Sequence, residues 1–472
     1  MGSDANPNPP VDATRAGGEG SAPQCGRGRN VLFLYGAITT YTNTIYEYVD
    51  AFHRYSGLRT FFGNLGQETH FDVDLSLFDA VAIHYSVRLP FDQISESAAE
   101  ALSRYQGLKY LFIQDEYDHT RRAWYWIRRL GIQLVFTVVP QAGVATVYPP
   151  QEFPGVRFVS VLTGYVSEHM DTGGNFAPPS TRELVVGYRG RPLPVRYGQL
   201  GFDKVEVGRM VQAYCQARGI ACDIAWTEEQ RIYGPAWYDF MASCRSMLGC
   251  ESGSNVFDWD GKLEHELAQL RSQGARVDER RAYEQVVRPL EIPGLMNQVS
   301  PRVFEAIAAG TVLVLFEGHY SGVVEPWRHY IPLAKDGSNL DEVFAKLADD
   351  AFVDAMARRA YDDVIASGRF GYRRFVAQVD SEVEASLRAL PAQAQPAERS
   401  PGRGATLPLS TAPLRSQPPM IYQAFMRLPP SWGAALRGAH RRAYPVWCGL
   451  PLPVRRVLKP PLQLAVKLLK RL

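Results

Sequence analysis

The sequence predicts an α/β protein with two Rossmann-like domains that face a cleft, followed by a Pro-rich linker and a basic amphipathic C-terminal tail. Short apolar segments typical of buried parallel strands alternate with helical segments, and this pattern occurs in two separate series. The chain of 472 residues is also too long for one compact core and suggests two or three domains. Its composition, with 46% hydrophobic and 21% charged residues, excludes wholesale disorder.

The first series defines an expected domain over residues 30–165. Residues 1–29 are rich in Gly, Pro, Asn and Asp without periodicity, so we expect them to be disordered. The strand-like segments are VLFLY, LRTFFGN, DAVAIHYS, LKYLFIQD and LVFTVVP, and helical spacing occurs at 41–55, 96–105 and 121–130. Strands that alternate with helices of this length predict a parallel sheet covered on both faces.

The second series defines an expected domain over residues 180–390. An irregular segment near 149–179 joins it to the first. The strand-like segments are ELVVGY, CDIAW, SMLGCES and TVLVLFEG, with helical patterns at 205–217, in VFEAIAAG and from 341 to about 390. Ligands of such sheets bind beyond the carboxyl ends of the strands.

The C-terminal part of the chain differs from the rest in composition and charge. Residues 391–430 contain nine prolines and are typical of a linker, and residues 431–472 form a short basic segment. From residue 399 onward there are thirteen Lys and Arg and no Asp or Glu, whereas residues 1–398 carry a net charge of −11. If residues 462–472 are helical, apolar and basic side chains occupy opposite faces, which is typical of a helix on an anionic membrane.

These features suggest peripheral attachment to the inner face of a membrane, and a basic tail without a partner remains the alternative. No nucleic acid partner is expected, because the tail lacks interleaved aromatic residues and the body is acidic. No apolar run of about 18 residues and no secretory signal is found, so we expect a cytoplasmic protein. The six cysteines are scattered and predict neither a disulfide framework nor a zinc site.

The most specific motif lies between residues 300 and 339. Arg302-Val-Phe-Glu305-Ala-Ile-Ala-Ala-Gly310-Thr, followed by an apolar strand, resembles the donor-binding element of GT-B glycosyltransferases. The resemblance is closest to the glycosyl transferases group 1 and the spore-maturation-type glycosyltransferases. It implies that Glu305 accepts hydrogen bonds from the ribose hydroxyls of a nucleotide sugar, and a carboxylate is suited to two adjacent hydroxyls. A solvated or helix-capping carboxylate is the alternative for Glu305.

A group of basic residues follows the first strand of the second series. Arg189 and Arg191 lie directly after this strand, and Lys204 lies in the next segment. By the same resemblance, basic residues here neutralise the departing nucleoside diphosphate, because cleavage of a sugar–phosphate bond builds negative charge on the leaving oxygen. Arginines in polar loops are also often simply solvated.

A polar loop follows the SMLGC strand, and its small residues suit close approach of a phosphate or a sugar. We expect Glu251, Ser252 and Ser254 to contact the donor. Asp258 and Asp260 have a DxD-like spacing, but without further carboxylates a turn stabilised by their side chains is favoured over a metal site. We therefore predict no metal and no cofactor besides the nucleotide-sugar substrate.

Two strands of the first series end in polar residues, which are expected in the cleft on the acceptor side. The LKYLFIQ strand runs into Asp115-Glu-Tyr-Asp-His119, and the DAVAIHYS strand ends near Arg88. Asp115 and His119 are candidates for the polar chemistry of the acceptor hydroxyl, which needs a base or a positioning partner. A core or surface role is equally open for either residue.

Together these residues predict a glycosyltransferase, hexosyltransferase-like, that moves a sugar from a nucleotide-diphosphate donor to an acceptor hydroxyl of a carbohydrate or lipid-linked molecule in envelope polysaccharide or glycolipid synthesis. One position departs from the family pattern. Many retaining members carry a Glu eight residues before the position of Glu305, and here this residue is Asn297. Stereochemistry therefore stays open, as do a sugar-nucleotide epimerase or hydrolase and a catalytically silent sugar-nucleotide-binding scaffold.

Overall fold

The first domain is built on a seven-stranded sheet. The computed structural model describes residues 28–227, 229–272, 279–390 and 408–417. The strands are β1 (Asn30–Tyr35), β2 (Arg59–Asn64), β3 (Ala80–Ile83), β4 (Leu108–Ile113), β5 (Leu134–Thr137), β6 (Arg157–Ser160) and β12 (Leu409–Ser410). Their order is β12-β2-β1-β3-β4-β5-β6, and all neighbours are parallel except the β12–β2 pair. The helices are α1 (Asn43–Tyr55), α2 (Glu96–Arg104), α3 (Thr120–Leu130) and α4 (Val144–Val147).

The second domain contains a five-stranded parallel sheet. Its strands are β7 (Leu184–Arg189), β8 (Cys222–Ala225), β9 (Cys244–Gly249), β10 (Val312–Phe316) and β11 (Tyr330–Leu333), in the order β11-β10-β9-β7-β8. Its helices are α5 (Gly198–Arg218), α6 (Pro235–Ser243), α7 (Lys262–Ser272), α8 (Glu279–Ala282), α9 (Pro301–Ala308), α10 (Leu340–Leu347) and α11 (Asp350–Ala360). In both sheets the chain reverses its direction of winding beside the first strand, which creates a switch point where ligands bind.

The sequence predicts these elements where apolar residues are continuous. All six residues of β1 are buried, as expected for a strand covered on both faces. α5 begins and ends at glycines with left-handed backbone, Gly198 (φ 66°) and Gly219 (φ 64°), and the second of these caps the helix. The predicted fold class of two Rossmann-like domains in a GT-B-like arrangement is confirmed.

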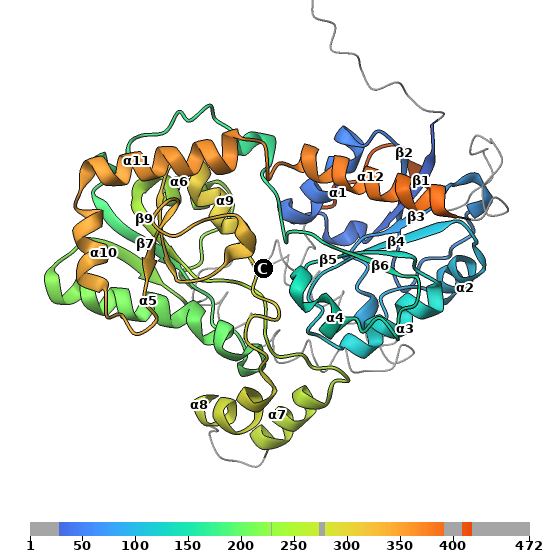
Figure 1. Ribbon diagram of the computed structural model, residues 1–472, viewed down its shortest axis with the longest axis horizontal. Helices are drawn as coiled ribbons and strands as arrows, with labels where there is room; N and C mark the ends of the chain where they lie inside the picture. Colours follow the sequence, from blue (N-terminus) through green and yellow to red (C-terminus); the bar gives the residue numbers. More distant parts are fainter. Residues whose placement is uncertain (1–27, 228, 273–278, 391–407, 418–472) are drawn as a thin grey trace, which may run out of the picture.

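The last long helix of the body belongs to the first domain, although it follows the second domain in sequence. α12 (Tyr372–Ala389) lies along α1, and Figure 1 shows it in orange over the blue and cyan domain. Phe375 and Val379 of α12 belong to the same buried cluster as Phe33 of β1. The predicted second domain at 180–390 therefore assigns α12 to the wrong core, because an apolar helix face does not specify which sheet it covers.

Three strands were not expected from the sequence. β11 (Tyr330–Leu333) follows TVLVLFEG, the last strand-like segment identified in the second series. β6 lies within the segment near 149–179 that was predicted to be irregular, and β12 lies within the predicted linker 391–430. β6 has no fully buried residue, which explains the weak apolar signal. Residues 1–27 and the predicted tail 431–472 lie outside the described residues. Within the described part of the chain, no helix is long and apolar enough to span a membrane.

The carboxyl ends of the two sheets face each other. The loop after β4 contacts the loop after β9, because the amide of Asp258 donates to the carbonyl of Tyr117 (2.9 Å). The hydroxyl of Thr163, after β6, donates to the carbonyl of Val299, just before α9 (2.7 Å). Figure 1 shows the domains side by side, with α7 and α8 below the region between them.

Candidate functional site

A cavity of about 230 Å³ lies at the carboxyl ends of β7 and β9, which is the switch point of the second sheet. It is bounded by these two strands, β10, α5, α6 and α9. The polar and aromatic residues that line it include Tyr188, Arg191, Lys204, Trp237, Ser252, Ser300 and Arg302. We call this cavity the cationic pocket, because three of its lining residues are basic and none is acidic.

The three cations reach the cationic pocket from different elements. Lys204 is on α5, and its Nζ donates to the carbonyl of Glu251 (3.2 Å) and to the hydroxyl of Ser252 (3.1 Å). Arg302 is in the first turn of α9 and donates to the carbonyl of Arg189 (2.6 Å). Arg191 is exposed and makes no hydrogen bond or ion pair with any described residue. Positive charge on three sides favours an anionic ligand, and phosphate is suited to the guanidinium groups.

Arg189 has a different role from its predicted partners Arg191 and Lys204. Its guanidinium is paired with Asp223 (2.7 Å), donates to the carbonyls of Tyr188 and Asp223, and lies over the ring of Phe240. The Arg189 side chain is 11% exposed and does not line the cationic pocket. The structure therefore brings Arg191 and Lys204 to the pocket and leaves Arg189 in the contact between β7 and β8.

Glu251 connects three loops instead of facing the pocket. Its carboxylate accepts from the amides of His319 (3.1 Å) and Tyr320 (2.9 Å) and from the amide nitrogen of Asn297 (2.5 Å). A side chain at Gly318 would collide with this carboxylate, so glycine is required there for close approach. Asn297, the position that departs from the family pattern, is thus used to hold Glu251.

The two serines of the same loop differ in position. Ser252 lines the cationic pocket and exchanges backbone hydrogen bonds with Gln298 (2.7 and 2.8 Å). Ser254 is fully buried, and its hydroxyl bonds to backbone groups of Val256 and Tyr197. Only Ser252 of the predicted trio Glu251, Ser252 and Ser254 therefore has its side chain at the cavity wall.

Glu305 lies behind the wall of the cationic pocket. Its carboxylate accepts from the indole nitrogen of Trp237 (2.8 Å), and Trp237 itself lines the pocket. Burial raises the pKa of Glu305, and the hydrogen bond from Trp237 partly offsets this rise. The Glu305 carboxylate is thus bonded to a residue of the lining and is not itself among the described residues that line the cavity.

A second cavity, of about 180 Å³, lies in the first domain at the carboxyl ends of β3 and β4. We call it the mixed pocket, because it is lined mainly by apolar and aromatic residues together with one cation and one carboxylate. The cation is Arg88, which lies over the ring of Phe91 at 4.0 Å, and the carboxylate is Asp115. Aromatic faces and paired polar groups suit a polyhydroxylated ligand.

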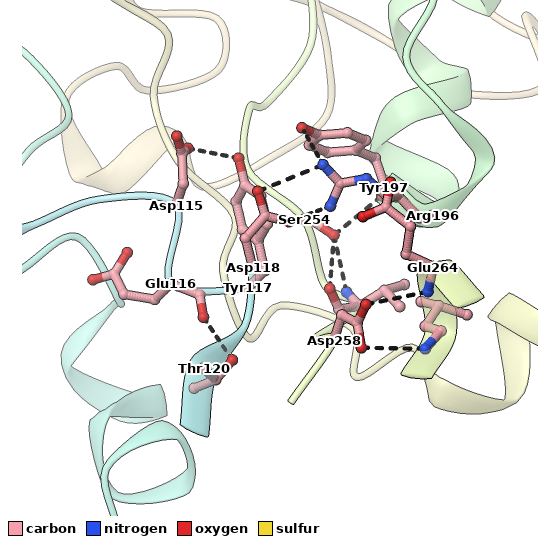
Figure 2. A network of polar contacts seen from close by, with 12 residues as sticks. Asp115, Glu116, Tyr117, Asp118, Thr120, Arg196, Tyr197, Ser254, Asp258 and Glu264 are labelled. Atoms are coloured by element: carbon pink, nitrogen blue, oxygen red, sulfur yellow. Dashed lines mark hydrogen bonds and ion pairs between the residues drawn. The ribbon is translucent and has the colours of Figure 1, made fainter. Parts of the chain in front are cut away.

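The loop after β4 carries both predicted acceptor-side residues. Asp115 is exposed, and its carboxylate accepts from the hydroxyl of Tyr117 (2.7 Å; Figure 2). His119 packs edge-on against Phe91 at 5.3 Å and contacts the loop at Gly261. Asp115 therefore faces the mixed pocket, whereas His119 does not line it.

Glu116, between Asp115 and Tyr117, is a buried acid that the sequence analysis did not select. One carboxylate oxygen accepts from Thr137 and from the amide of Val138, and the other has no hydrogen-bond partner among the described residues. Burial raises the pKa of Glu116 to about 8. The acid is therefore held uncharged beneath the Asp115 loop at neutral pH.

The predicted turn role of Asp258 and Asp260 agrees with their contacts. Asp258 accepts from the amides of Leu263 and Glu264 at the start of α7, and Asp260 is paired with Lys262 (2.8 Å). Among the described residues, no group of three or more His, Cys, Asp or Glu side chains is arranged to hold a metal ion.

Two further residues of the cationic pocket escaped the sequence analysis. Arg302 belongs to the Glu305 motif, but the sequence predicts no role for it. Trp237 lies on α6, whose segment carries no motif. In the sequence, Arg302 comes directly before the apolar residues of a helical segment that precedes the TVLVLFEG strand. This position is the signal that could have identified it. Nothing in the local sequence distinguishes Trp237 from a core residue.

Comparison with known proteins gives matches among solved structures. No family model matches the chain, and no curated protein matches it. An alpha-glucosyltransferase in complex with UDP and a 13-mer DNA matches with a TM-score of 0.45 and 9% identity over 76% of this chain and 100% of that one. A DNA-modifying beta-glucosyltransferase (TM-score 0.42, 12% identity) covers 76% and 99%, and a sucrose-phosphate synthase from Thermosynechococcus elongatus (TM-score 0.41, 10% identity) covers 76% and 100%.

One expectation about partners is corrected by these matches. The sequence analysis excluded nucleic acid on the composition of the tail and the acidic body. Three of the similar structures are alpha-glucosyltransferases bound to DNA, so the exclusion was wrong. The reason is that overall charge does not describe the local surface around a site, which decides what attaches there.

Proposed function

We propose that the protein is a glycosyltransferase that binds a nucleoside-diphosphate sugar in the cationic pocket and transfers the sugar to an acceptor hydroxyl in the mixed pocket. The observation that carries this proposal is the cationic pocket itself: three basic and no acidic lining residues at the switch point of a parallel sheet. A diphosphate needs such cations, and the mixed pocket lies on the opposing carboxyl edge, in the other domain.

The donor half of the mechanism follows from charge. When the bond between the sugar and the diphosphate breaks, negative charge grows on the departing phosphate oxygen. Lys204 would stabilise it as a point charge held by Glu251 and Ser252, and Arg191 is available for a bidentate contact. These cations perform the leaving-group role without a metal. Glu305 would accept from the ribose hydroxyls once Trp237 turns away.

The acceptor half requires removal of one proton. The acceptor oxygen forms a bond to the anomeric carbon while the diphosphate leaves, and its proton passes to a base. Asp115 is the candidate base, because it is exposed at the mixed pocket and Tyr117 fixes its carboxylate. His119 would act through the loop and not on the substrate, since it packs on Phe91.

The identity of the acceptor is inferred from the tail. Thirteen basic and no acidic residues after residue 398 favour an anionic surface, and each basic residue near such a surface contributes on the order of 1 kcal/mol. We infer a cytoplasmic enzyme, peripheral on the inner membrane face, that transfers a hexose to a glycolipid or envelope polysaccharide. Membrane fractionation of the full chain and of a chain that ends at residue 417 tests this, and equal membrane association of both would contradict it.

The decisive experiment is a binding and turnover screen. UDP, GDP and TDP sugars and CMP-sugars are added to the full chain, and binding is followed by thermal shift and calorimetry. One donor should bind and release its nucleoside diphosphate faster when lipid-linked, polysaccharide or oligonucleotide acceptors are supplied. Interconversion of the free donor sugar would favour an epimerase, and binding without any release would favour a silent scaffold. Absence of all nucleotide binding would refute the proposal.

A further inference from the structure

The loop that carries Asp115 has an unusual backbone. Asp115 (φ 58°) and His119 (φ 50°), at its two ends, both lie in the left-handed region, which disfavours residues other than glycine. Such backbone persists where surrounding contacts hold it, and within the first domain the hydroxyl of Thr120 binds the carbonyl of Glu116 (2.7 Å). Glu116 is also held by Thr137 and Val138, and His119 packs on Phe91. Further contacts come from the second domain.

Arg196 of the second domain provides the main contact. Its guanidinium pairs with the carboxylate of Asp118 through both terminal nitrogens and also donates to the hydroxyl of Tyr197 (3.2 Å). The Arg196 and Asp118 side chains are 20% and 7% exposed, so the pair is largely shielded from water. Figure 2 shows this pair next to Tyr117, whose hydroxyl points to Asp115.

Tyr117 is held from the second domain as well. Its carbonyl accepts from the amide of Asp258, and its ring lies 5.5 Å from the ring of Tyr197. Three residues of the loop therefore form one chain of contacts. Arg196 holds Asp118, the second domain holds Tyr117, and Tyr117 orients the Asp115 carboxylate.

Arg196 also lies close in sequence to the cationic pocket. It belongs to the short helix Val195–Tyr197. Arg191 and Leu193, before this helix, line the cationic pocket, and Lys204, on the following α5, lines it too. Nucleotide contacts on either side of Arg196 would thus restrain the segment that reaches across to Asp118.

We propose that Arg196 is a positioning residue that sets the Asp115 carboxylate for catalysis and links occupancy of the cationic pocket to the geometry of the mixed pocket. This inference rests on the proposed function, because it needs Asp115 to act on an acceptor. Among the described residues, Arg196 lines neither the cationic pocket nor the mixed pocket. Its effect on Asp115 therefore passes through Asp118 and Tyr117.

The test uses hydrolysis of UDP-glucose, with water as the acceptor, and calorimetry with UDP. Arg196→Ala should lower the hydrolysis rate at saturating donor by about tenfold or more, while the Kd for UDP stays within about twofold. Asp118→Asn should do the same, and the double variant should be no slower than either single variant, because both remove one contact. Arg196→Lys should restore part of the rate through a single charge contact.

A matched control separates positioning from general stability. Arg121→Ala removes an exposed pairing of α3 with Asp260 of the second domain (3.8 Å), and hydrolysis should stay at the wild-type rate. Hydrogen exchange of the loop amides gives a readout without turnover: exchange at Asp118 and Arg122 should speed up in Arg196→Lys and Asp118→Asn, but not in Arg121→Ala.

The outcomes are distinct. Wild-type hydrolysis and loop exchange in Arg196→Ala and Asp118→Asn would overturn the inference while leaving the transferase proposal intact. Full activity of Asp115→Asn would also overturn it, since no catalytic carboxylate would then need positioning. Failure of wild-type protein to bind any nucleotide of the screen would instead refute the proposed function from which the inference starts.

Discussion

The two pockets of this protein lie at the carboxyl edges of two sheets of related winding, yet their linings differ. The cationic pocket is lined by three basic residues and no acidic one. The mixed pocket is lined by one arginine and one carboxylate together with aromatic and aliphatic side chains. Strand order sets where each cavity forms, and the side chains after each strand set which ligand it suits. These linings favour an anionic ligand in the second domain and a neutral polar ligand in the first.

Removal of the cations from one pocket should give the largest effect. The double variant Arg191→Ala/Lys204→Ala should weaken UDP binding by about 100-fold, because two charge-assisted contacts to the diphosphate are lost. Calorimetry measures this, and Lys335→Ala, which breaks a pairing with Asp203 and lies outside the lining, should leave the Kd unchanged. Equal affinities of the double variant and the wild type would assign the anion to another site.

The buried acids distinguish the domains in their response to pH. Both oxygens of Glu251 accept hydrogen bonds, whereas one oxygen of Glu116 has no partner among the described residues and its pKa is raised to about 8. Between pH 4.5 and 8 the unfolded chain loses the Glu116 proton but the folded chain keeps it, so stability falls as pH rises. Relative to Glu116→Gln, the wild type should lose on the order of 1 kcal/mol per pH unit in this window.

Urea unfolding at several pH values measures this difference. Gln keeps the carbonyl oxygen that accepts from Thr137 and Val138, so the variant should have a flatter profile without losing its hydrogen bonds. Glu251→Gln is the contrasting variant, because its amide would face N–H donors, and it should destabilise the protein at every pH. Parallel profiles of the wild type and Glu116→Gln would show that Glu116 is charged in the folded protein.

The two arginines that flank Gly190 should separate stability from binding. Arg189→Ala should lower the free energy of unfolding by about 1 kcal/mol, since it removes the pairing of a mostly buried guanidinium with the half-exposed Asp223, but should leave UDP affinity unchanged. Arg191→Ala should weaken UDP binding and leave the free energy of unfolding unchanged. Chemical unfolding and calorimetry on both variants check this pair, and Arg209→Ala, which breaks an exposed pairing with Glu206, serves as the neutral control.

The smallest expected effect concerns the segment that adds β12 to the first domain. The hydroxyl of Thr40 donates to the carbonyl of Leu414 and accepts from the amide of Ser416 (2.9 and 2.8 Å). Thr40→Val keeps the shape but removes these contacts, so the free energy of unfolding should fall by about 0.5–1 kcal/mol. UDP affinity should not change, because the segment lies on the other domain; a changed Kd would contradict the separation of the two pockets.

The strands that the sequence identified were those with unbroken apolar segments, such as β1, β4 and β10, whose residues are all buried. Burial on both faces of a parallel sheet leaves a local signature that needs no knowledge of neighbours. β6, at an edge and half-exposed, has no such signature. The placement of Arg191, Lys204 and Ser252 at one cavity was also predictable. Arg191 and Lys204 follow β7, Ser252 follows β9, and the carboxyl ends of parallel strands lie at the same edge of a sheet.

The roles of other residues depended on partners distant in sequence. The sequence does not distinguish Arg189 from Arg191. In the structure, Arg189 pairs with Asp223 on the neighbouring strand, whereas Arg191 lines the cationic pocket. Glu251 was read as a donor contact and instead holds Asn297 and the His319 loop.

Composition and periodicity thus determined the fold class and the edge of each sheet where a ligand is expected, because burial of a strand on both faces leaves a local pattern. Only the tertiary structure decided which domain α12 covers, which cations remain available and that Arg196 reaches Asp118 in the other domain. Electrostatic and hydrogen-bond partners are chosen by proximity in space, and that proximity exists only after the two domains have folded against each other.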